Sequence, residues 1–489
     1  MEVDARTLDS AGLDADVCIV GAGPAGLTVA RALAASGTRI VVLESGGRTR
    51  DPDVQALSDG TTLGDPYAGP GITRHRQAGG TAVMWNTWLG DEMGAKYVPL
   101  DAIDFEARDW LPLSGWPFDR ASLDPYYERA QSLCGLGPYR YRGEDWATPD
   151  RPLLPLSSSA LTTDVYQFGT ARLFTDVYLQ DVRAARNVLL CLHATAVELA
   201  TDPSGRLVTD ARAARVTGRP LRVRARQFVL AAGGIENARL LLLSNGVKSG
   251  GLGNESDMVG RCFMEHPRDR SCRLVPTDPG LADRCGFYSI HRTDAGLVMG
   301  RIAFTEEARR RGQLPAMSVT LQPRPRRFRW LRAGRRRGGD VLELLINLEQ
   351  APDRDNRIVL GTDRDRFDRP KPVIHWRWRE LDRANLARVH ATLAGAFERS
   401  GLGRIVVDAA ATPDPNAHHH LGTTRMSDDP LAGAVTRDAR VHGVANLFVA
   451  GSSVFPTGGF ANPTLTATAL ALRLADHLRD RLEKRPRLG

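Results

Sequence analysis

The sequence lacks the cysteine pairs from which thiolate metal centres are built. Its 489 residues include six cysteines, and none of them forms a C-x-x-C pair. This spacing argues against an iron–sulfur cluster and against a thiolate zinc site. We expect reduced, mostly buried thiols of an intracellular protein, although six cysteines could in principle pair.

The sequence also lacks long apolar runs. No stretch of about 18 residues is free of charged and polar side chains, so no membrane span is expected. Residues 1–17, MEVDARTLDSAGLDADV, are acidic and contain no basic region followed by an apolar one, which argues against a secretory signal. These absences predict a cytoplasmic protein.

Most of the chain lacks an excess of positive charge. The formal net charge is +8, yet residues 323–337, PRPRRFRWLRAGRRR, contain eight arginines and no acid. The segment could be a patch for nucleic acid or an anionic membrane, with Phe328 and Trp330 interleaved for stacking or insertion. It could also be a solvated insertion loop. We favour the loop, and expect no nucleic-acid partner, because one basic segment without a recognisable binding fold is weak evidence.

What is present begins with residues 15–44, ADVCIVGAGPAGLTVARALAASGTRIVVLE, which have the pattern of a βαβ unit. Residues 17–20 suit a short buried parallel strand, residues 27–36 have helical spacing, and residues 39–43 suit a second strand. The motif G-x-G-x-x-G stands at the first turn. This combination predicts a dinucleotide site in an α/β fold.

Each glycine of the motif has a physical role. Gly21 allows a tight turn, Gly23 lets a pyrophosphate approach backbone N–H groups, and Gly26 lets the helix pack close to the strand. The phosphates would lie at the positive end of the helix dipole. Glu44, directly after the second strand, is placed to accept ribose hydroxyls. The unit alone does not distinguish FAD from NAD.

Further glycine clusters favour a long dinucleotide that contacts several loops. One is RHRQAGGTAVMWN at residues 74–86, and another is FVLAAGGIENARLLLLSNG at residues 228–246. The second predicts a strand, a glycine turn and a helix far from the amino terminus. Each cluster alone could be an ordinary turn, but together they predict a nucleotide domain assembled from separated segments.

The carboxyl-terminal segment predicts a further strand at residues 446–453, a loop, and an amphipathic helix over residues 465–482. The strand would bring the loop to the carboxyl edge of the sheet, where ligands of doubly wound folds bind. Pro463 suits a first helical turn, so the helix start can point N–H groups at an electron-rich ring.

Residues 416–426, NAHHHLGTTRM, contain three adjacent histidines that could bind a metal, lie idle on a loop, or include a base. On a strand, consecutive side chains point to opposite faces, so the three rings would not share one ion. No further ligand stands at a zinc-like spacing. We therefore expect no metal.

In order and spacing, these segments resemble the glucose–methanol–choline (GMC) flavoprotein oxidoreductases over nearly the whole chain. Other matching stretches are SGWPFDRASLDPYYERA, MVGRCFMEHP, EQAPDRDNRIVL and NPTLTATALALRLADHL. The G-T-x-R-M and N-P-T-L-T stretches are most similar to those of the branch active on sugars and polyols, which includes pyranose 2-oxidase and bacterial sugar and aminoglycoside dehydrogenases.

The resemblance implies an α/β fold with a discontinuous Rossmann-like FAD-binding domain and a substrate domain built on a mostly antiparallel sheet with helices. It assigns residues 14–99, 190–267 and 430–489 to the first domain and residues 100–189 and 268–429 to the second. FAD should be non-covalent, because Met84 stands where pyranose 2-oxidase has its attaching histidine. Many members have Asp in place of Gly451 and Gly in place of Ser427, which leaves details of the phosphate contacts open.

The resemblance also carries cofactor contacts onto this sequence. The implied FAD-binding residues are Gly21, Gly23, Pro24, Ala25, Gly26, Glu44, Ser45, Arg76, Gly79, Gly80, Thr81, Met84, Trp85, Val197, Ala232, Gly233, Asn237, Gly451, Ser452, Asn462, Pro463 and Thr464.

For catalysis, the family's base corresponds to His419, three residues before Gly422, and its partner corresponds to Asn462. An imidazole suits abstraction of a hydroxyl proton, and an amide can hold the substrate oxygen without competing for that proton. His418 and His420 are expected to be structural, and His266 could be structural or act directly.

The implied reaction is oxidation of an alcohol carbon of a sugar, glycoside, polyol or aminoglycoside, with O₂, a quinone or another compound as electron acceptor. Alternatives are a lyase or photoenzyme of the same family, a membrane- or partner-associated dehydrogenase subunit, and an NAD-linked enzyme.

Overall fold

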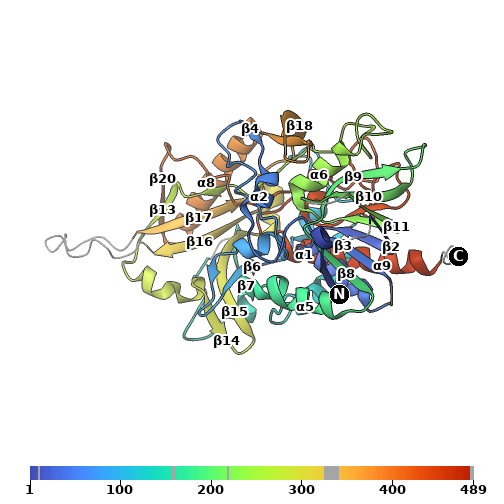
Figure 1. The fold of residues 1–489 in the computed structure, drawn as a ribbon. Helices are drawn as coiled ribbons and strands as arrows, with labels where there is room; N and C mark the ends of the chain where they lie inside the picture. Colours follow the sequence, from blue (N-terminus) through green and yellow to red (C-terminus); the bar gives the residue numbers. More distant parts are fainter. Residues whose placement is uncertain (9–10, 157–159, 217–219, 324–340, 485–489) are drawn as a thin grey trace.

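The computed structural model describes residues 1–8, 11–156, 160–216, 220–323 and 341–484. The arginine-rich segment therefore lies, apart from Pro323, outside the described residues. Two large sheets stand side by side, the eight-stranded one on the right of Figure 1 and the ten-stranded one on the left.

The eight-stranded sheet has a parallel core. Its order is β1 (Glu2–Asp4), β8 (Val188–Leu192), β3 (Ile40–Leu43), β2 (Gly12–Val20), β11 (Leu221–Leu230), β10 (Val208–Ala214) and β9 (Thr195–Thr201), with β21 (Leu447–Val449) also paired to β11. Neighbours from β1 to β11, and β21 on β11, are parallel, whereas β10 and β9 are antiparallel. The predicted strands all occur, and β2 and β11 extend further toward their amino ends than the sequence indicated. The strand predicted over residues 446–453 is shorter, because it ends at Val449 and a 3-10 turn follows at Ser452–Val454.

The ten-stranded sheet is antiparallel at every pairing. Its order is β20 (Gly403–Val407), β13 (Cys272–Pro276), β17 (Leu342–Leu348), β16 (Met317–Pro323), β15 (Gly296–Phe304), β7 (Leu161–Thr170), β6 (Met93–Tyr97) and β5 (Thr87–Trp88), with β12 (Arg268–Asp269) on β17 and β14 (His291–Thr293) on β15. A smaller sheet contains β18 (Arg357–Arg364), β19 (Pro370–Trp376) and β4 (Thr61–Gly64). The implied fold class is confirmed, while the division of the chain into domains stays a prediction.

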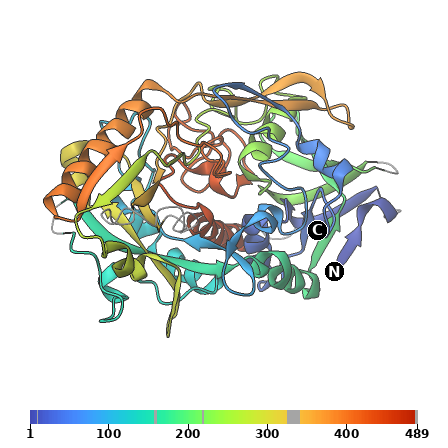
Figure 2. The ribbon, with the colours of Figure 1, turned by 90° about the vertical axis from the view of Figure 1, so that its left-hand side faces the viewer.

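Helices cover and connect the sheets. They are α1 (Pro24–Ala34), α2 (Pro52–Gln55), α3 (Ala102–Phe105), α4 (Asp124–Leu133), α5 (Tyr178–Ala184), α6 (Gly233–Leu243), α7 (Glu306–Gly312), α8 (Glu380–Arg399) and α9 (Thr464–Glu483). Helix α9 is buried along most of its length, and Figure 2 shows it in the middle of the molecule. No described helix is both long enough and apolar enough to cross a bilayer.

All six cysteines are buried and unpaired, as the sequence predicts. Burial raises the pKa of the Cys285 thiol to about 11 and that of the Cys191 thiol to about 12, because a thiolate would lose its hydration there. These side chains therefore act as small core residues.

A buried ion pair joins α8 to the ten-stranded sheet and makes stability depend on pH. His390 Nε2 lies 2.8 Å from Asp269 Oδ2. Burial of the ring opposes its charge, but the hydrogen bond to Asp269 and the contact with Cys272 together outweigh this effect and raise the pKa of His390 to about 9. Because the folded pKa lies above the ordinary value of 6.5, this stabilisation is complete below about pH 6.5 and is lost as the pH rises through about 9.

We expect the melting temperature of the wild type to fall between about pH 6.5 and pH 9.5 and this slope to be much smaller in His390→Gln. The effect is on the order of 3 kcal/mol at most. Thermal unfolding across this range checks the prediction, and Asp269→Asn is the matched control that removes the same pair. An unchanged slope in both variants would contradict it.

Candidate active site

The carboxyl ends of four parallel strands meet at one edge of the eight-stranded sheet. Val20 of β2 pairs with Leu43 of β3 and with Leu230 of β11, and Leu230 pairs with Val449 of β21. The segments that follow these strands must therefore come together. They line a cavity of about 480 Å³.

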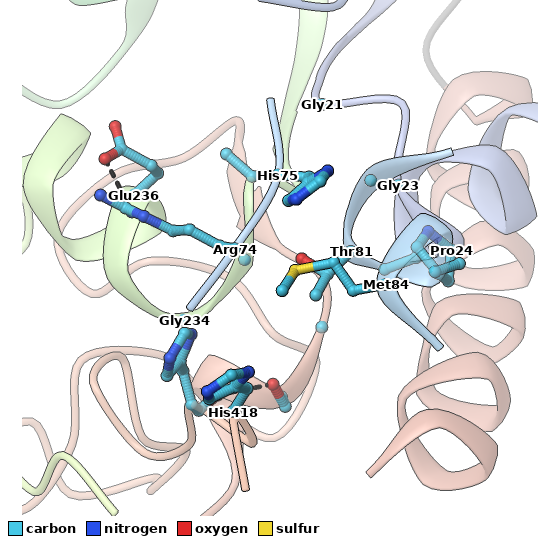
Figure 3. A pocket seen from close by; sticks show the side chains of 18 of the residues that line it. Gly21, Gly23, Pro24, Arg74, His75, Thr81, Met84, Gly234, Glu236 and His418 are labelled. Carbon is cyan, nitrogen blue, oxygen red and sulfur yellow. Dashed lines mark hydrogen bonds and ion pairs between the residues drawn. The ribbon is translucent and has the colours of Figure 1, made fainter. Parts of the chain in front are cut away.

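Most of the residues predicted to bind the cofactor line this cavity. They are Gly21, Gly23, Pro24, Ala25, Glu44, Ser45, Arg76, Gly80, Thr81, Met84, Trp85, Ala232, Gly233, Gly451, Ser452, Asn462, Pro463 and Thr464. Figure 3 shows Pro24 on one side of the cavity and Glu236 on the opposite side, with Met84 and Thr81 between them. Segments far apart in sequence thus share one site.

Four of the predicted residues do not line the cavity. They are Gly26, Gly79, Val197 and Asn237. A Cβ at Gly26 would lie 2.0 Å from the oxygen of Gly21, so this glycine lets α1 pack close to the turn, as predicted. The N–H of Gly79 donates to the oxygen of Ala22 at 2.9 Å and anchors the second glycine cluster.

Asn237 connects two of the loops at the edge of the sheet. Its Oδ1 accepts the N–H of Ala232 at 2.8 Å, and its Nδ2 donates to Ser453 Oγ at 3.0 Å. Val197 is buried in β9, beside the cavity-lining Ala196. Asn237 therefore joins loops that carry cavity-lining residues, whereas Val197 faces the other side of β9 from Ala196.

Three helices begin at the cavity. Gly23 precedes α1, Ala232 precedes α6 and Pro463 precedes α9, and none of these positions makes a side-chain capping bond. The first backbone N–H groups of a helix have no partner within the helix, and the helix dipole makes this end positive. Three uncapped starts around one cavity suit phosphate groups and an electron-rich ring.

Glu44 is fixed toward the first turn. Its carboxylate accepts the N–H of Ala22 at 2.9 Å and that of Gly46 at 2.8 Å. Burial raises its pKa, while the two backbone donors oppose this change. Each carboxylate oxygen retains a lone pair for a further donor, such as a ribose hydroxyl.

Sequence reasoning missed a charged cluster on the cavity wall. Arg74 Nη1 lies 2.8 Å from Glu236 Oε1, and Arg76 Nη2 lies 2.9 Å from Glu236 Oε2 (Figure 3 shows the Arg74 pair). Burial alone would raise the pKa of Glu236, but the surrounding guanidinium groups hold it well below its usual range. The available signal was an acid in the first turn of α6 together with R-x-R before Gly79, far apart in sequence.

The three adjacent histidines lie in a loop, not on a strand. His418 has a left-handed backbone with φ +60°, and all three residues line the cavity. The expected alternation of faces is therefore wrong. Within the described residues, the close group of possible metal ligands is a different one, made by Asp269, Cys272 and His390.

His419 is held by hydrogen bonds at two points. Its Nδ1 lies 2.9 Å from Nδ1 of His266, and its backbone N–H donates to Glu265 Oε2 at 2.8 Å. The hydroxyl of Tyr67 donates to the other oxygen of Glu265 at 2.5 Å. Burial raises the pKa of Glu265 to about 7, although these donors oppose it.

The electrostatics of the loop keep the histidines neutral. Burial, followed by the neighbouring His266 and Lys96, holds the pKa of His419 well below its ordinary value. Burial also lowers the pKa of His420 to about 3, and its ring packs against Phe263 with centroids 5.9 Å apart. A neutral His419 keeps a lone pair that can accept a proton at physiological pH.

Asn462 offers a polar group to a bound molecule. Its Oδ1 is buried and has no hydrogen-bond partner among the described residues, although the residue lines the cavity. A buried acceptor without a donor is unfavourable, so a ligand that supplies the donor would be stabilised. The glycine-rich turns at residues 21–26 and 79–80, here called the nucleotide cradle, lie around this cavity with the uncapped helix starts and the Asn462 amide. Together they fit a bound flavin dinucleotide.

Comparison with known proteins agrees with this geometry. An FAD binding domain model matches residues 16–261, and a GMC oxidoreductase model matches residues 352–471. The chain belongs to the GMC oxidoreductase family. It is an FAD-dependent oxidoreductase, so the resemblance and the cofactor inferred from the sequence are confirmed.

Several characterised relatives align with nearly the whole enzyme. Paromamine 6'-oxidase of Streptomyces fradiae is 28% identical, over 94% of this chain and 90% of its own. The large subunit of fructose dehydrogenase from Gluconobacter japonicus is 26% identical, over 96% and 99%. C-glycoside 3-oxidase of Microbacterium trichothecenolyticum is 26% identical, over 96% and 97%.

Solved structures show the same fold. Formate oxidase of Aspergillus oryzae aligns with a TM-score of 0.60 at 16% identity, over 97% of this chain and 100% of its own. Pyridoxine 4-oxidase of Mesorbium loti aligns with a TM-score of 0.58 at 18% identity, over 95% and 99%.

Proposed function

We propose that this GMC oxidoreductase oxidises the CH–OH group of a sugar, glycoside or polyol to a carbonyl. His419 takes the hydroxyl proton, and Asn462 holds the substrate oxygen. The bound FAD supplies a hydride acceptor. The single observation that carries the proposal is the position of His419, which lines the same cavity as the nucleotide cradle. Its Nδ1 is engaged by His266, and its lowered pKa keeps the ring neutral. Relatives named as a fructose dehydrogenase and a C-glycoside oxidase support this substrate class, whereas those named as paromamine and hydroxyparomomycin oxidases point to aminoglycosides.

The charges around the site favour a neutral substrate over a cationic aminoglycoside. Among the described cavity-lining residues, the only carboxylates are Glu44 and Glu236. The first accepts two backbone N–H groups, and the second pairs with two arginines. Near His419, the cationic groups Lys96 and Arg268 contribute to lowering its pKa. Arg268 is itself paired with Asp414 at 2.5 Å, so Lys96 is the cation of these two that an ammonium group would meet without a paired carboxylate.

Anaerobic absorbance scans of the FAD-loaded enzyme test this function. We expect a neutral sugar, glycoside or polyol to bleach the oxidised flavin, and aminoglycosides to react at least tenfold more slowly, because placing like charges together costs several kcal/mol. Faster bleaching by aminoglycosides would contradict the charge argument and leave alcohol oxidation standing.

The same experiment separates the remaining alternatives. If no alcohol bleaches the flavin, the lyase and photoenzyme alternatives take precedence. Readmission of air distinguishes the electron acceptors, since rapid reoxidation identifies O₂ and slow reoxidation identifies a quinone or a partner. One relative is named as the large subunit of a dehydrogenase, which supports the alternative that a partner protein accepts the electrons. Reoxidation of the reduced flavin by a soluble quinone tests this alternative.

A further inference from the structure

Two histidine rings meet at the catalytic end of the cavity, and their hydrogen bonds determine where the protons lie. His266 is 1% exposed, and its Nε2 lies 3.0 Å from the backbone oxygen of Gly458. Its Nδ1 lies 2.9 Å from Nδ1 of His419. The rings meet edge to face, with centroids 5.1 Å apart and an interplanar angle of 77°.

The proton positions follow from the chemistry of the partners. A carbonyl oxygen only accepts, so Nε2 of His266 must carry the proton that it donates to Gly458. Burial lowers the pKa of His266 to about 4, so its ring is neutral at physiological pH and holds one N–H proton. Its Nδ1 is therefore a lone pair, and this lone pair can only accept the N–H of His419.

We propose that His266 is a positioning residue that fixes His419 as the Nδ1–H tautomer and so leaves Nε2 of His419 as the basic nitrogen for the substrate hydroxyl. This inference rests on the proposed role of His419 as the base. The orientation of a catalytic imidazole by a partner on its other nitrogen is a general way to fix its tautomer.

The surroundings hold this arrangement in place. Gly458 leaves room for His266, because a Cβ at this glycine would lie 2.9 Å from the Nε2 atom. Glu265 accepts a hydrogen bond from the backbone N–H of His419, so it fixes the backbone of that residue and leaves the imidazole ring to His266. The charged or titratable groups that influence the pKa of His419 are His266, Lys96, Arg268 and His420. None of the hydrogen bonds of the described residues joins Nε2 of His419 to a protein group, and this nitrogen is left for the substrate.

Two variants of His266 separate positioning from simple packing. In His266→Asn, the side-chain oxygen can occupy the place of Nδ1 and still accept the N–H of His419. In His266→Gln, the amide reaches the place of Nε2, keeps the bond to Gly458 and leaves Nδ1 of His419 without its acceptor. FAD content and melting temperature of both variants show whether each folds.

We expect the rate of flavin reduction to fall about 10- to 100-fold in His266→Gln, the size of effect seen when a metal-binding histidine loses the partner that orients it. In His266→Asn we expect a fall of less than about fivefold, because the acceptor is kept. A structural role would instead affect both variants alike. Equal losses in the two variants, or no loss in His266→Gln, would overturn the proposal.

The tautomer itself can be read without turnover. Long-range ¹H–¹⁵N spectra of the FAD-loaded enzyme, labelled at its 11 histidines, report which nitrogen of each ring carries hydrogen. His419 is assigned by the signals lost in His419→Ala. We expect a pyridine-type Nε2 in the wild type and in His266→Asn, and a mixture of tautomers in His266→Gln.

A protonated Nε2 in the neutral wild-type ring would overturn the proposal even if neither variant folds. Conversely, the predicted spectrum in an enzyme that no alcohol reduces would confirm the tautomer, and the proposed function would be the part that fails.

Discussion

His419→Ala is expected to keep bound FAD and to lose about 10³-fold in the rate of substrate-dependent flavin reduction, within the range of roughly 10²- to 10⁴-fold that a general base contributes. The loss follows because no other neutral imidazole takes its place. Within the described residues, the ring of His420 packs against Phe263, and Nε2 of His266 is engaged with the backbone oxygen of Gly458. Stopped-flow flavin reduction in the absence of oxygen measures the rate, and the absorbance of the purified protein measures FAD.

The matched control is His418→Asn. His418 lines the same cavity, and none of the hydrogen bonds found among the described residues involves its ring. Asparagine tolerates its left-handed backbone at φ +60°. We expect less than a tenfold change in this variant. Equal rates in His419→Ala and the wild type would remove His419 as the base.

The pH dependence of the same step follows from the direction of the pKa shift. The pKa of His419 lies well below its ordinary value because of burial and nearby positive charge. The lone pair is therefore lost only as the pH falls through this lowered pKa. We expect protonation of His419 to lower the rate of flavin reduction on the acidic side of neutrality.

The nucleotide cradle could be predicted from the sequence because its rules are local. Gly21, Gly23 and Gly26 lie within six consecutive residues, and each is needed for a turn or a close approach that a side chain would block. The register of the parallel strands then fixes which later segments join them. Glu44 and the helix start at Pro463 could be placed for this reason.

The catalytic loop could be predicted only in part. The conformation of residues 418–420 depends on Glu265, which accepts a hydrogen bond from the backbone N–H of His419 across 154 residues of sequence. No local sequence pattern predicts this contact. The pairing of Glu236 with Arg74 likewise joins two segments that meet only in the folded chain. Long-range polar contacts have no periodicity in the sequence, so residue types could be identified but their partners could not.

Gly23→Val is expected to fold and to lose FAD. The backbone of Gly23 has an ordinary φ of −84°, and a Cβ there would meet only Gly80 at 3.7 Å, so the protein itself accepts a side chain. The valine methyl groups would instead occupy the space between the first turn and the second glycine cluster. Each charge-assisted hydrogen bond to the pyrophosphate that is lost, at about 1.5–3 kcal/mol, corresponds to a roughly 10- to 150-fold weaker affinity.

The control for this variant is Gly26→Ala, three residues further on. Its Cβ would lie 2.0 Å from the oxygen of Gly21, so the added methyl group collides with the protein and not with the cofactor. We expect it to lower the melting temperature of the apoprotein, whereas Gly23→Val changes that temperature little and loses the increase that FAD gives to the wild type. Stoichiometric FAD in Gly23→Val would contradict the assignment of this turn to the pyrophosphate. A large fall in the melting temperature of the Gly23→Val apoprotein would contradict the expectation that the folded protein accepts a side chain at this position.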